Sequence, residues 1–163
     1  QILVNLGIVP ALAGYKREVA LVENDIATYQ CRWVKLKVIN KQSPWFKKID
    51  QLYLPVAHQE GKFMASKKIL DQLNKKKLII CKYMNDRGLV AKKQFPYNPN
   101  GSMEDIAALT NLKGNVLAMM PHPERALYFL QRPDWISHKR EANKNELYAD
   151  GYKIFKNAYD YFK

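Results

Sequence analysis

The sequence predicts an α/β protein with a mixed sheet. Apolar runs of strand length alternate with helical patterns and long loops over the 163 residues, an order typical of helices packed on a sheet. Residues 78–83 are apolar with little alternation, which indicates a strand covered on both faces. Residues 150–162 predict a closing amphipathic helix. Its aromatic residues at helical spacing are Tyr152, Phe155, Tyr159 and Phe162.

The first half of the chain is expected to hold most of the strands. Residues 1–6 predict the end of a helix that Gly7 stops, because glycine accepts the left-handed backbone that ends helices. The expected strands are residues 17–22, 29–39 and 53–57. The first two are separated by turn-forming residues at 23–25. A break at residues 43–46 predicts a short helix before the third strand.

The second half is expected to alternate helices with strands. Ser66 is a suitable cap for a helix through Leu73, whose apolar residues cover one face. Residues 95–102 contain Pro96, Pro99 and Gly101 and predict a loop. Ser102 to Asp105 has the spacing of a capping box, which leaves open whether a helix follows at 106–109. Residues 116–120 predict a buried strand.

Composition excludes several classes of protein. A hydrophobic fraction of 47% with 26% charged residues argues against disorder, and no apolar run approaches a membrane span. The two cysteines form no framework, so a cytoplasmic protein with reduced thiols is expected. The net charge of +12 could favour an anionic partner. Because the basic residues lie in separate segments, solvated faces are favoured over a nucleic-acid groove, and neither nucleic acid nor a membrane is an expected partner.

A His-x-Glu pattern follows two of the predicted strands, at His58–Glu60 and at His122–Glu124. A histidine with a carboxylate near enough to orient its ring suits a general base and its orienting group. The alternative is a surface histidine on a stiff turn, since the pattern is short. Spacing does not rank the two pairs. A shared metal site is not expected, because zinc ligands usually have tighter spacing.

Neither cysteine suits the nucleophile that such a base would activate. Cys31 lies within a predicted strand and Cys81 within an apolar run, so both are expected to be buried and inert. Gln1 is not a start methionine, and residues 1–7 resemble the interior of a helix whose start is missing. We therefore expect residues 1–163 to be the C-terminal portion of a single domain, with a nucleophile turn immediately before Gln1.

Several motifs together resemble one enzyme family. They are Gln1-Ile2-Leu3, Cys31-Arg32-Trp33-Val34, Pro55-Val56-Ala57-His58 with Glu60-Gly61, Asn98-Pro99-Asn100-Gly101-Ser102, and Met119-Met120-Pro121-His122-Pro123-Glu124-Arg125-Ala126. This combination resembles the glutaminase subunit of phosphoribosylformylglycinamidine synthase, a class I (triad) glutamine amidotransferase of purine biosynthesis. The resemblance runs through almost the whole chain. Gln59 and Ala118 depart from the family, which commonly has glycine at both positions.

The resemblance implies a fold and a set of site residues. The fold is a flavodoxin-like class I amidotransferase domain with a mixed, mostly parallel sheet, of which this chain would be the C-terminal part. His122 matches the catalytic base and Glu124 its orienting carboxylate. Gln1 matches the last residue of the nucleophile motif, which helps to hold substrate. Asn24 and Tyr29 fall in segments that resemble the rest of the substrate pocket. His58 and Glu60 match a turn outside the triad.

The resemblance also implies an activity and a partner. The family hydrolyses glutamine and supplies ammonia to a synthetase partner, which uses ATP and magnesium; no cofactor is expected on this chain, and no metal. The chain alone is expected to be inactive, since the nucleophile is not in it. Alternatives are an amidotransferase for another acceptor and a non-catalytic scaffold that binds the partner.

Overall fold

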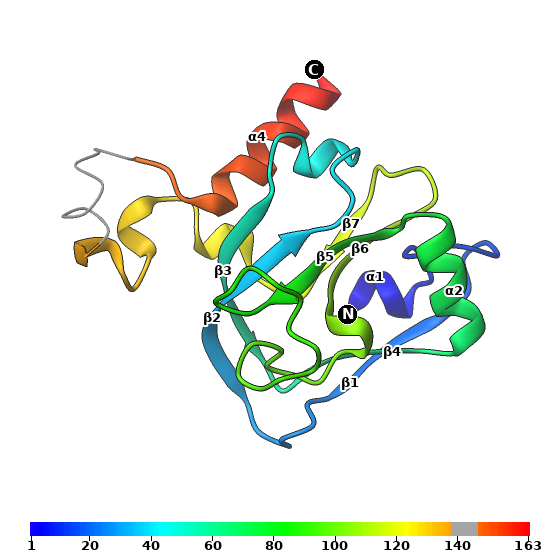
Figure 1. Ribbon diagram of the computed structural model, residues 1–163. Coiled ribbons are helices and arrows are strands. Elements are labelled where there is room, and N and C mark those ends of the chain that lie inside the picture. Colours follow the sequence, from blue (N-terminus) through cyan, green and yellow to red (C-terminus); the bar gives the residue numbers. More distant parts are fainter. Residues whose placement is uncertain (138–146) are drawn as a thin grey trace.

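The centre of the molecule is a five-stranded sheet in the order β3-β2-β5-β6-β7 (Figure 1). The computed structural model describes residues 1–137 and 147–163. The strands of this sheet are β2 (Gln30–Val38), β3 (Gln51–His58), β5 (Ile79–Met84), β6 (Ile106–Thr110) and β7 (Leu117–Met119). A second sheet pairs β1 (Val19–Glu23) with β4 (Glu60–Ala65).

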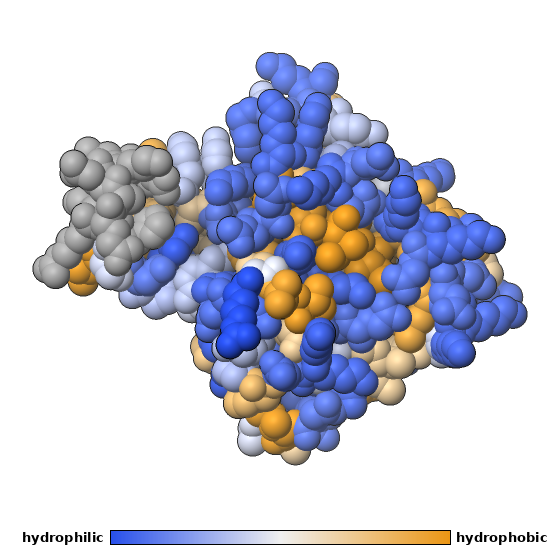
Figure 2. Space-filling view, in the orientation of Figure 1, coloured by the Kyte–Doolittle hydropathy of each residue, from blue (hydrophilic) through white to orange (hydrophobic). Residues whose placement is uncertain are grey.

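Helices and four short 3₁₀ turns surround the sheets in the described residues. The helices include α1 (Ile2–Asn5), α2 (Lys67–Lys75) and α4 (Asp150–Phe162), and residues 135–137 are also helical. The turns are η1 (Pro44–Phe46), η2 (Met103–Asp105), η3 (Pro123–Arg125) and η4 (Phe129–Gln131). Figure 1 shows α4 and α2 far apart on the molecule. On the face in Figure 2, apolar surface lies between the hydrophilic regions that these two helices form.

Two apolar clusters make up the core. One contains Leu36, Leu54 and Ile80 and reaches Ile154 of α4. The other contains residues of α1 and α2 together with Ile79 and Leu109. Strands β5 and β6 contribute to both clusters, so the five-stranded sheet is the layer that joins them.

The predicted α/β class is confirmed, but the predicted direction of strand pairing is wrong for the described strands. Every pair of neighbouring strands is antiparallel, whereas a mostly parallel sheet was expected. The strand at residues 78–83 is indeed buried along most of its length. Burial on both faces follows from the two clusters that β5 separates, and it carries no information about the direction of the neighbouring strands.

Several predicted elements are confirmed at the level of single residues. Helix α1 ends before Gly7, whose φ is +68°. The hydroxyl of Ser66 accepts a hydrogen bond from the Ile69 N–H at 3.3 Å, which caps α2. Helix α4 has the predicted bounds, yet its buried residues are Gly151 and Ile154. The predicted aromatic face is mostly exposed, with Phe155 at 46%, Tyr159 at 62% and Phe162 at 58%.

The capping-box spacing at Ser102 does not begin a helix. Residues 103–105 form a single 3₁₀ turn and β6 follows directly. The Ser102 hydroxyl donates to Oδ1 of Asn100 at 2.7 Å and accepts from the Phe63 N–H at 3.0 Å. The hydroxyl is therefore oriented toward Asn100 and Phe63, and it makes no helix-cap hydrogen bond.

Candidate active site

His122 lies where β7 leaves the sheet. Strand β7 pairs with β6, and the Met120 N–H continues this pairing by donating to the Ala107 carbonyl at 3.1 Å. Pro121 then turns the chain, and the His122 N–H donates to the Pro55 carbonyl of β3 at 2.8 Å. The backbone of His122 is thus fixed between the two edge strands of the sheet.

His122 and Glu124, the predicted base and its orienting group, are in direct contact. Nδ1 of His122 lies 2.6 Å from Oε1 of Glu124, with side-chain exposures of 32% and 54%. Since a carboxylate only accepts hydrogen bonds, Nδ1 carries the proton. The other ring nitrogen, Nε2, is then left unprotonated in the neutral ring and can accept a proton from a reacting group.

Helix α4 packs against η3, the turn that carries Glu124. The Gly151 N–H donates to the Ala126 carbonyl at 2.9 Å. A Cβ on Gly151 would lie 1.9 Å from the carbonyl oxygen of Pro123. Only glycine therefore allows the start of α4 to pack directly against η3, the turn that carries Glu124.

Gln1 joins His122 and Glu124 in one cavity. This open hollow of about 310 Å³ is also lined by apolar groups such as Leu117 and Phe155. Gln1 caps α1 at its first turn, and its Nε2 donates to Oε2 of Glu60 at 2.8 Å. The structure thus brings together three of the five predicted site residues.

Asn24 and Tyr29 do not line this cavity. Asn24 is only 2% exposed. Its amide donates to the carbonyls of Thr28 and His58 at 2.9 and 3.0 Å, and its oxygen accepts from the Gly61 N–H at 3.2 Å. Tyr29 is 59% exposed. The side chain of Asn24 is therefore occupied by fixing the turn at His58–Gly61, and no contact places either residue beside His122.

In the first His-x-Glu pair, His58 is buried and Glu60 is exposed. His58 is 5% exposed, and its ring packs so closely on Gly61 that a Cβ there would lie 2.6 Å from Nδ1. Burial lowers the pKa of His58; a backbone hydrogen bond partly opposes this, and the electrostatic interaction with His122 adds to it. Glu60 contacts Gln1 instead of its neighbouring histidine. Of the two His-x-Glu pairs, only His122 and Glu124 are hydrogen-bonded to each other in the described contacts.

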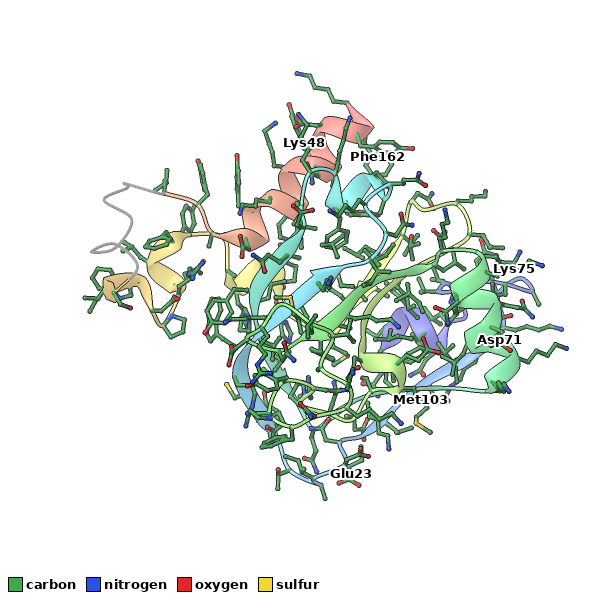
Figure 3. All side chains as sticks on the ribbon, viewed as in Figure 1. Glu23, Lys48, Asp71, Lys75, Met103 and Phe162 are labelled. Atoms are coloured by element: carbon green, nitrogen blue, oxygen red, sulfur yellow. The ribbon has the colours of Figure 1, made fainter. Side chains whose placement is uncertain are left out.

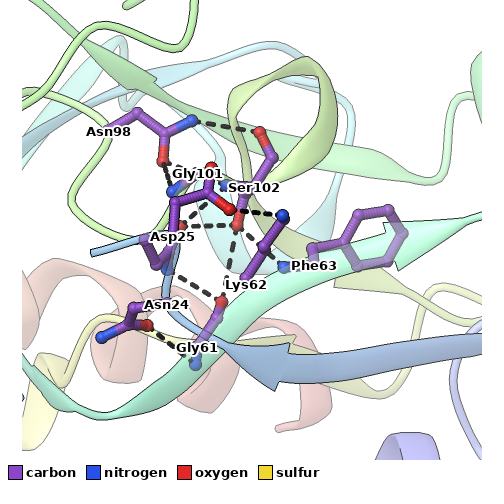
Figure 4. A network of polar contacts seen from close by, with 9 residues as sticks. Asn24, Asp25, Gly61, Lys62, Phe63, Asn98, Gly101 and Ser102 are labelled. Atoms are coloured by element: carbon purple, nitrogen blue, oxygen red, sulfur yellow. Dashed lines mark hydrogen bonds and ion pairs between the residues drawn. The ribbon is translucent and has the colours of Figure 1, made fainter. Parts of the chain in front are cut away.

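The Asn98–Ser102 loop fastens the same turn from the other side (Figure 4). Nδ2 of Asn100 donates to the Gly61 carbonyl at 2.8 Å and lies 3.4 Å from Nε2 of His58. Oδ1 of Asn98 accepts from the N–H groups of Gly101 and Ser102 at 2.9 and 3.2 Å. The contacts of the Asn98–Ser102 motif are therefore structural, because they hold the turn that bears Glu60 in place.

The two departures from the family pattern are accommodated without strain. Gln59 does not adopt a positive φ, so the turn needs no special backbone angle there. Ala118 pairs with Leu109 in the β6–β7 ladder and lines the cavity beside His122. Its methyl group therefore forms part of the wall of the site.

Neither cysteine lies in the cavity. Cys81 is buried in the core, which raises the pKa of its thiol and keeps it protonated. Cys31 is exposed on β2, so its predicted burial is wrong. Both lie outside the group that lines the hollow at His122, so neither supplies the nucleophile at this site.

A larger cleft of about 710 Å³ lies over β2 and β3 and contains Arg32 and Trp33 of the Cys31–Val34 motif. Its charged groups pair among themselves, as in Lys35–Asp86 at 2.8 Å and Arg132–Asp134 at 2.8 Å. It contains none of the predicted site residues. Chemistry therefore identifies the smaller hollow at His122 as the candidate site, although size alone would favour the larger cleft.

No group of three His, Cys, Asp or Glu side chains in residues 1–137 and 147–163 is arranged to bind a metal ion. Among the helices of the same residues, none has the length and apolar character needed to cross a membrane.

Comparison with known proteins gives a consistent result. The phosphoribosylformylglycinamidine synthase subunit PurQ of Methanococcus maripaludis is 36% identical over 99% of this chain, and that of Dehalococcoides mccartyi is 38% identical over 97%. The chain spans 62% and 58% of these relatives. The structure of PurLQS from Thermotoga maritima matches the whole chain with a TM-score of 0.65 and 28% identity, covering 58% of the matched chain.

A family model supplies the classification. The model for the CobB/CobQ-like glutamine amidotransferase domain matches residues 1–162, which include both members of the His122–Glu124 pair and Gln1. The fold similarity to PurLQS extends over the same residues. The chain therefore belongs to the family of CobB/CobQ-like glutamine amidotransferase domains.

Proposed function

We propose that the complete protein is the glutaminase subunit of phosphoribosylformylglycinamidine synthase. It hydrolyses glutamine and supplies ammonia to an ATP-dependent synthetase partner in purine biosynthesis. The observation that carries the proposal is the His122–Glu124 contact of 2.6 Å at a cavity that Gln1 also lines. The names of the similar PurQ subunits and the PurLQS complex support the choice of acceptor and partner.

In the proposed reaction His122 moves protons between three groups. A cysteine thiol expected just before Gln1 gives its proton to Nε2 of His122, and the thiolate sulfur attacks the side-chain amide carbon of glutamine. His122 returns this proton to the leaving nitrogen, the C–N bond breaks, and ammonia departs. Nε2 next accepts a proton from water, which attacks the thioester. Glutamate leaves, and the proton returns to the cysteine sulfur.

Glu124 acts through His122 in each of these steps. It holds the proton on Nδ1 and stabilises the positive charge that the ring gains when Nε2 is protonated. ATP and magnesium are proposed to belong to the synthetase partner, with no cofactor on this chain and a cytoplasmic location for the complex.

The test compares two histidine variants of the complete protein in the presence of the synthetase. We expect His122→Ala to lower ammonia release from glutamine by roughly 10²- to 10⁴-fold, the usual contribution of a general base. His58→Ala, measured per folded molecule by circular dichroism, should retain much of the activity because His58 has no place in the cavity. Equal losses in both variants would contradict the assignment of the catalytic pair.

The acceptor is tested separately. Ammonia formed by the wild-type protein should appear in formylglycinamidine ribonucleotide when the synthetase, ATP and magnesium are present. Glutaminase activity without this transfer would indicate an amidotransferase for another acceptor. Absence of any glutaminase activity in the complete protein would favour a scaffold that only binds the partner.

A further inference from the structure

Glu60 contacts Gln1 although 59 residues separate them in the sequence. Glu60 begins β4, and Gln1 begins α1. The contact is a hydrogen bond of 2.8 Å from Nε2 of Gln1 to Oε2 of Glu60. Gln1 also lines the cavity that contains His122 and Glu124. Glu60 is thus one contact away from the candidate active site.

The backbone at Glu60 is held on both sides by buried amides. On one side, the Asn24 side chain binds the His58 carbonyl and the Gly61 N–H, and the Asn24 N–H donates to the Gln59 carbonyl at 2.9 Å. On the other side, Asn100 donates to the Gly61 carbonyl. Asn24 and Asn100 are 2% and 1% exposed. The position of Glu60 is therefore set by a rigid and well-bonded turn.

The chemistry of this contact fixes the orientation of the Gln1 amide. A carboxylate has only acceptor atoms, so the amide nitrogen of Gln1 must face Glu60. The amide oxygen, Oε1, then remains as a free acceptor, and no described hydrogen bond uses it. A freely rotating Gln1 amide could present either its N–H donor or its oxygen acceptor to a ligand. The contact with Glu60 removes the first of these two orientations.

We propose that Glu60 is a positioning residue that holds Gln1 so that Oε1 accepts a hydrogen bond from an N–H donor of the bound glutamine. This inference rests on the proposed glutaminase function. The donor is either the side-chain amide of glutamine or its α-ammonium group. The first choice would let the site select glutamine against glutamate, because a carboxylate in the same place has no N–H to donate.

The test measures steady-state glutaminase kinetics of the complete protein with its synthetase. Glu60→Ala should raise KM for glutamine by roughly tenfold, as expected for the loss of one hydrogen bond to a charged group, with kcat nearly unchanged. Glu60→Gln should restore part of the affinity because its amide oxygen still accepts from Gln1. The double variant with Gln1→Ala should be no weaker than Gln1→Ala alone, since Glu60 acts only through Gln1.

Product inhibition identifies the donor. If the side-chain amide is the donor, Glu60→Ala leaves inhibition by glutamate unchanged or makes it tighter. If the α-ammonium is the donor, the inhibition constant for glutamate rises in parallel with KM. Both outcomes support the positioning role.

A matched control lies directly across the ladder. Glu23 is the β1 partner of Glu60 and lies at the exposed end of that strand (Figure 3). Its Oε1 accepts a long hydrogen bond of 3.5 Å from Nε2 of Gln59, and no hydrogen bond between described residues joins it to Gln1. Glu23→Ala should leave KM unchanged. An unchanged KM in Glu60→Ala, with wild-type thermal stability, would overturn the proposal while leaving the glutaminase function intact. A wild-type protein that releases no ammonia would instead overturn the proposed function itself.

Discussion

Two histidines in the same His-x-Glu pattern occupy opposite environments. His122 is partly exposed and bonded to a carboxylate, which suits a group that must exchange protons. His58 is buried, and an amide nitrogen of Asn100 lies 3.4 Å from its Nε2. Its Nδ1 has no hydrogen-bond partner among the described residues. The site of His58 therefore favours a neutral ring.

The environment of His58 predicts a loss of stability in mild acid. Burial lowers the pKa of His58 in the folded state below its ordinary value of 6.5. As the pH falls below about 6.5, the unfolded chain takes up a proton that the folded protein does not, so unfolding becomes more favourable. The free energy of unfolding falls by at most about 1.4 kcal/mol per pH unit for this one proton. The fall stops once the pH is below the pKa of His58 in the folded state. Melting temperatures between pH 5 and 7.5 measure the effect.

His58→Gln provides the comparison for this prediction. The amide of glutamine does not titrate in this range, so the variant should show a shallower fall in melting temperature below pH 6.5, whatever its stability at pH 7.5. Parallel curves for the wild type and the variant would show that His58 does not keep its folded pKa below the unfolded one.

At the scale of elements, the site depends on the packing of α4 against η3. Gly151 allows this approach, and Asn157 adds hydrogen bonds from α4 to the carbonyls of Trp45 and Lys47 at 3.2 and 2.9 Å. Helix α4 thus connects η1 and η3, the two short turns on either side of it. The position of Glu124 follows from where this helix lies.

Gly151→Ala should therefore impair both stability and catalysis. The added Cβ would lie 1.9 Å from the Pro123 oxygen and 2.7 Å from the Ala126 oxygen, so η3 or α4 must move. We expect a stability loss of about 1–3 kcal/mol from overpacking. A shift of Glu124 by about 1 Å should lower kcat by roughly 10²-fold. Thermal unfolding and glutaminase kinetics of the complete protein check both effects.

Lys153→Ala is the control for Gly151→Ala. Lys153 lies on the first turns of the same helix and is 56% exposed, with an ion pair to Asp150. Its replacement should change stability by less than about 0.5–1 kcal/mol and leave kcat unchanged. A Gly151→Ala protein with wild-type kcat would show that the His122–Glu124 pair does not depend on this contact.

Local pattern predicted the elements whose signals lie within a few residues and missed those that depend on distant partners. The cap at Ser66 and the His122–Glu124 contact join residues two or three positions apart, so spacing indicated both contacts. Only the family resemblance, however, ranked this His-x-Glu pair above His58–Glu60. Strand β4 was missed because Gly61 and Lys62 interrupt its apolar pattern, although it alternates in burial once it pairs with β1. The contact between Glu60 and Gln1 could not be predicted, since it depends on how α1 packs beside β4.

At the scale of the whole molecule, strand direction and cooperativity depend on the arrangement of the two core clusters. The antiparallel order β3-β2-β5-β6-β7 arises from long-range pairing that no single segment encodes. Ile80 belongs to the first cluster and its neighbour Ile79 to the second. Since adjacent residues of one strand serve both clusters, disruption of one cluster should disturb the other.

This arrangement predicts that the two clusters unfold together. Leu73 of the second cluster is fully buried, and Leu73→Ala should cost about 2–5 kcal/mol. Trp33 and Trp45 pack against the first cluster. In a background with Trp135→Phe, the fluorescence of these two residues reports on the part of the molecule that the substitution does not touch. In the complete protein, the fluorescence and circular dichroism transitions should shift to lower temperature by the same amount. Leu54→Ala, in the first cluster, is the matched variant. Its fluorescence and circular dichroism transitions should also shift together.

A Leu73→Ala protein whose fluorescence transition stays in place would show that the clusters unfold independently and that the single-domain prediction is wrong.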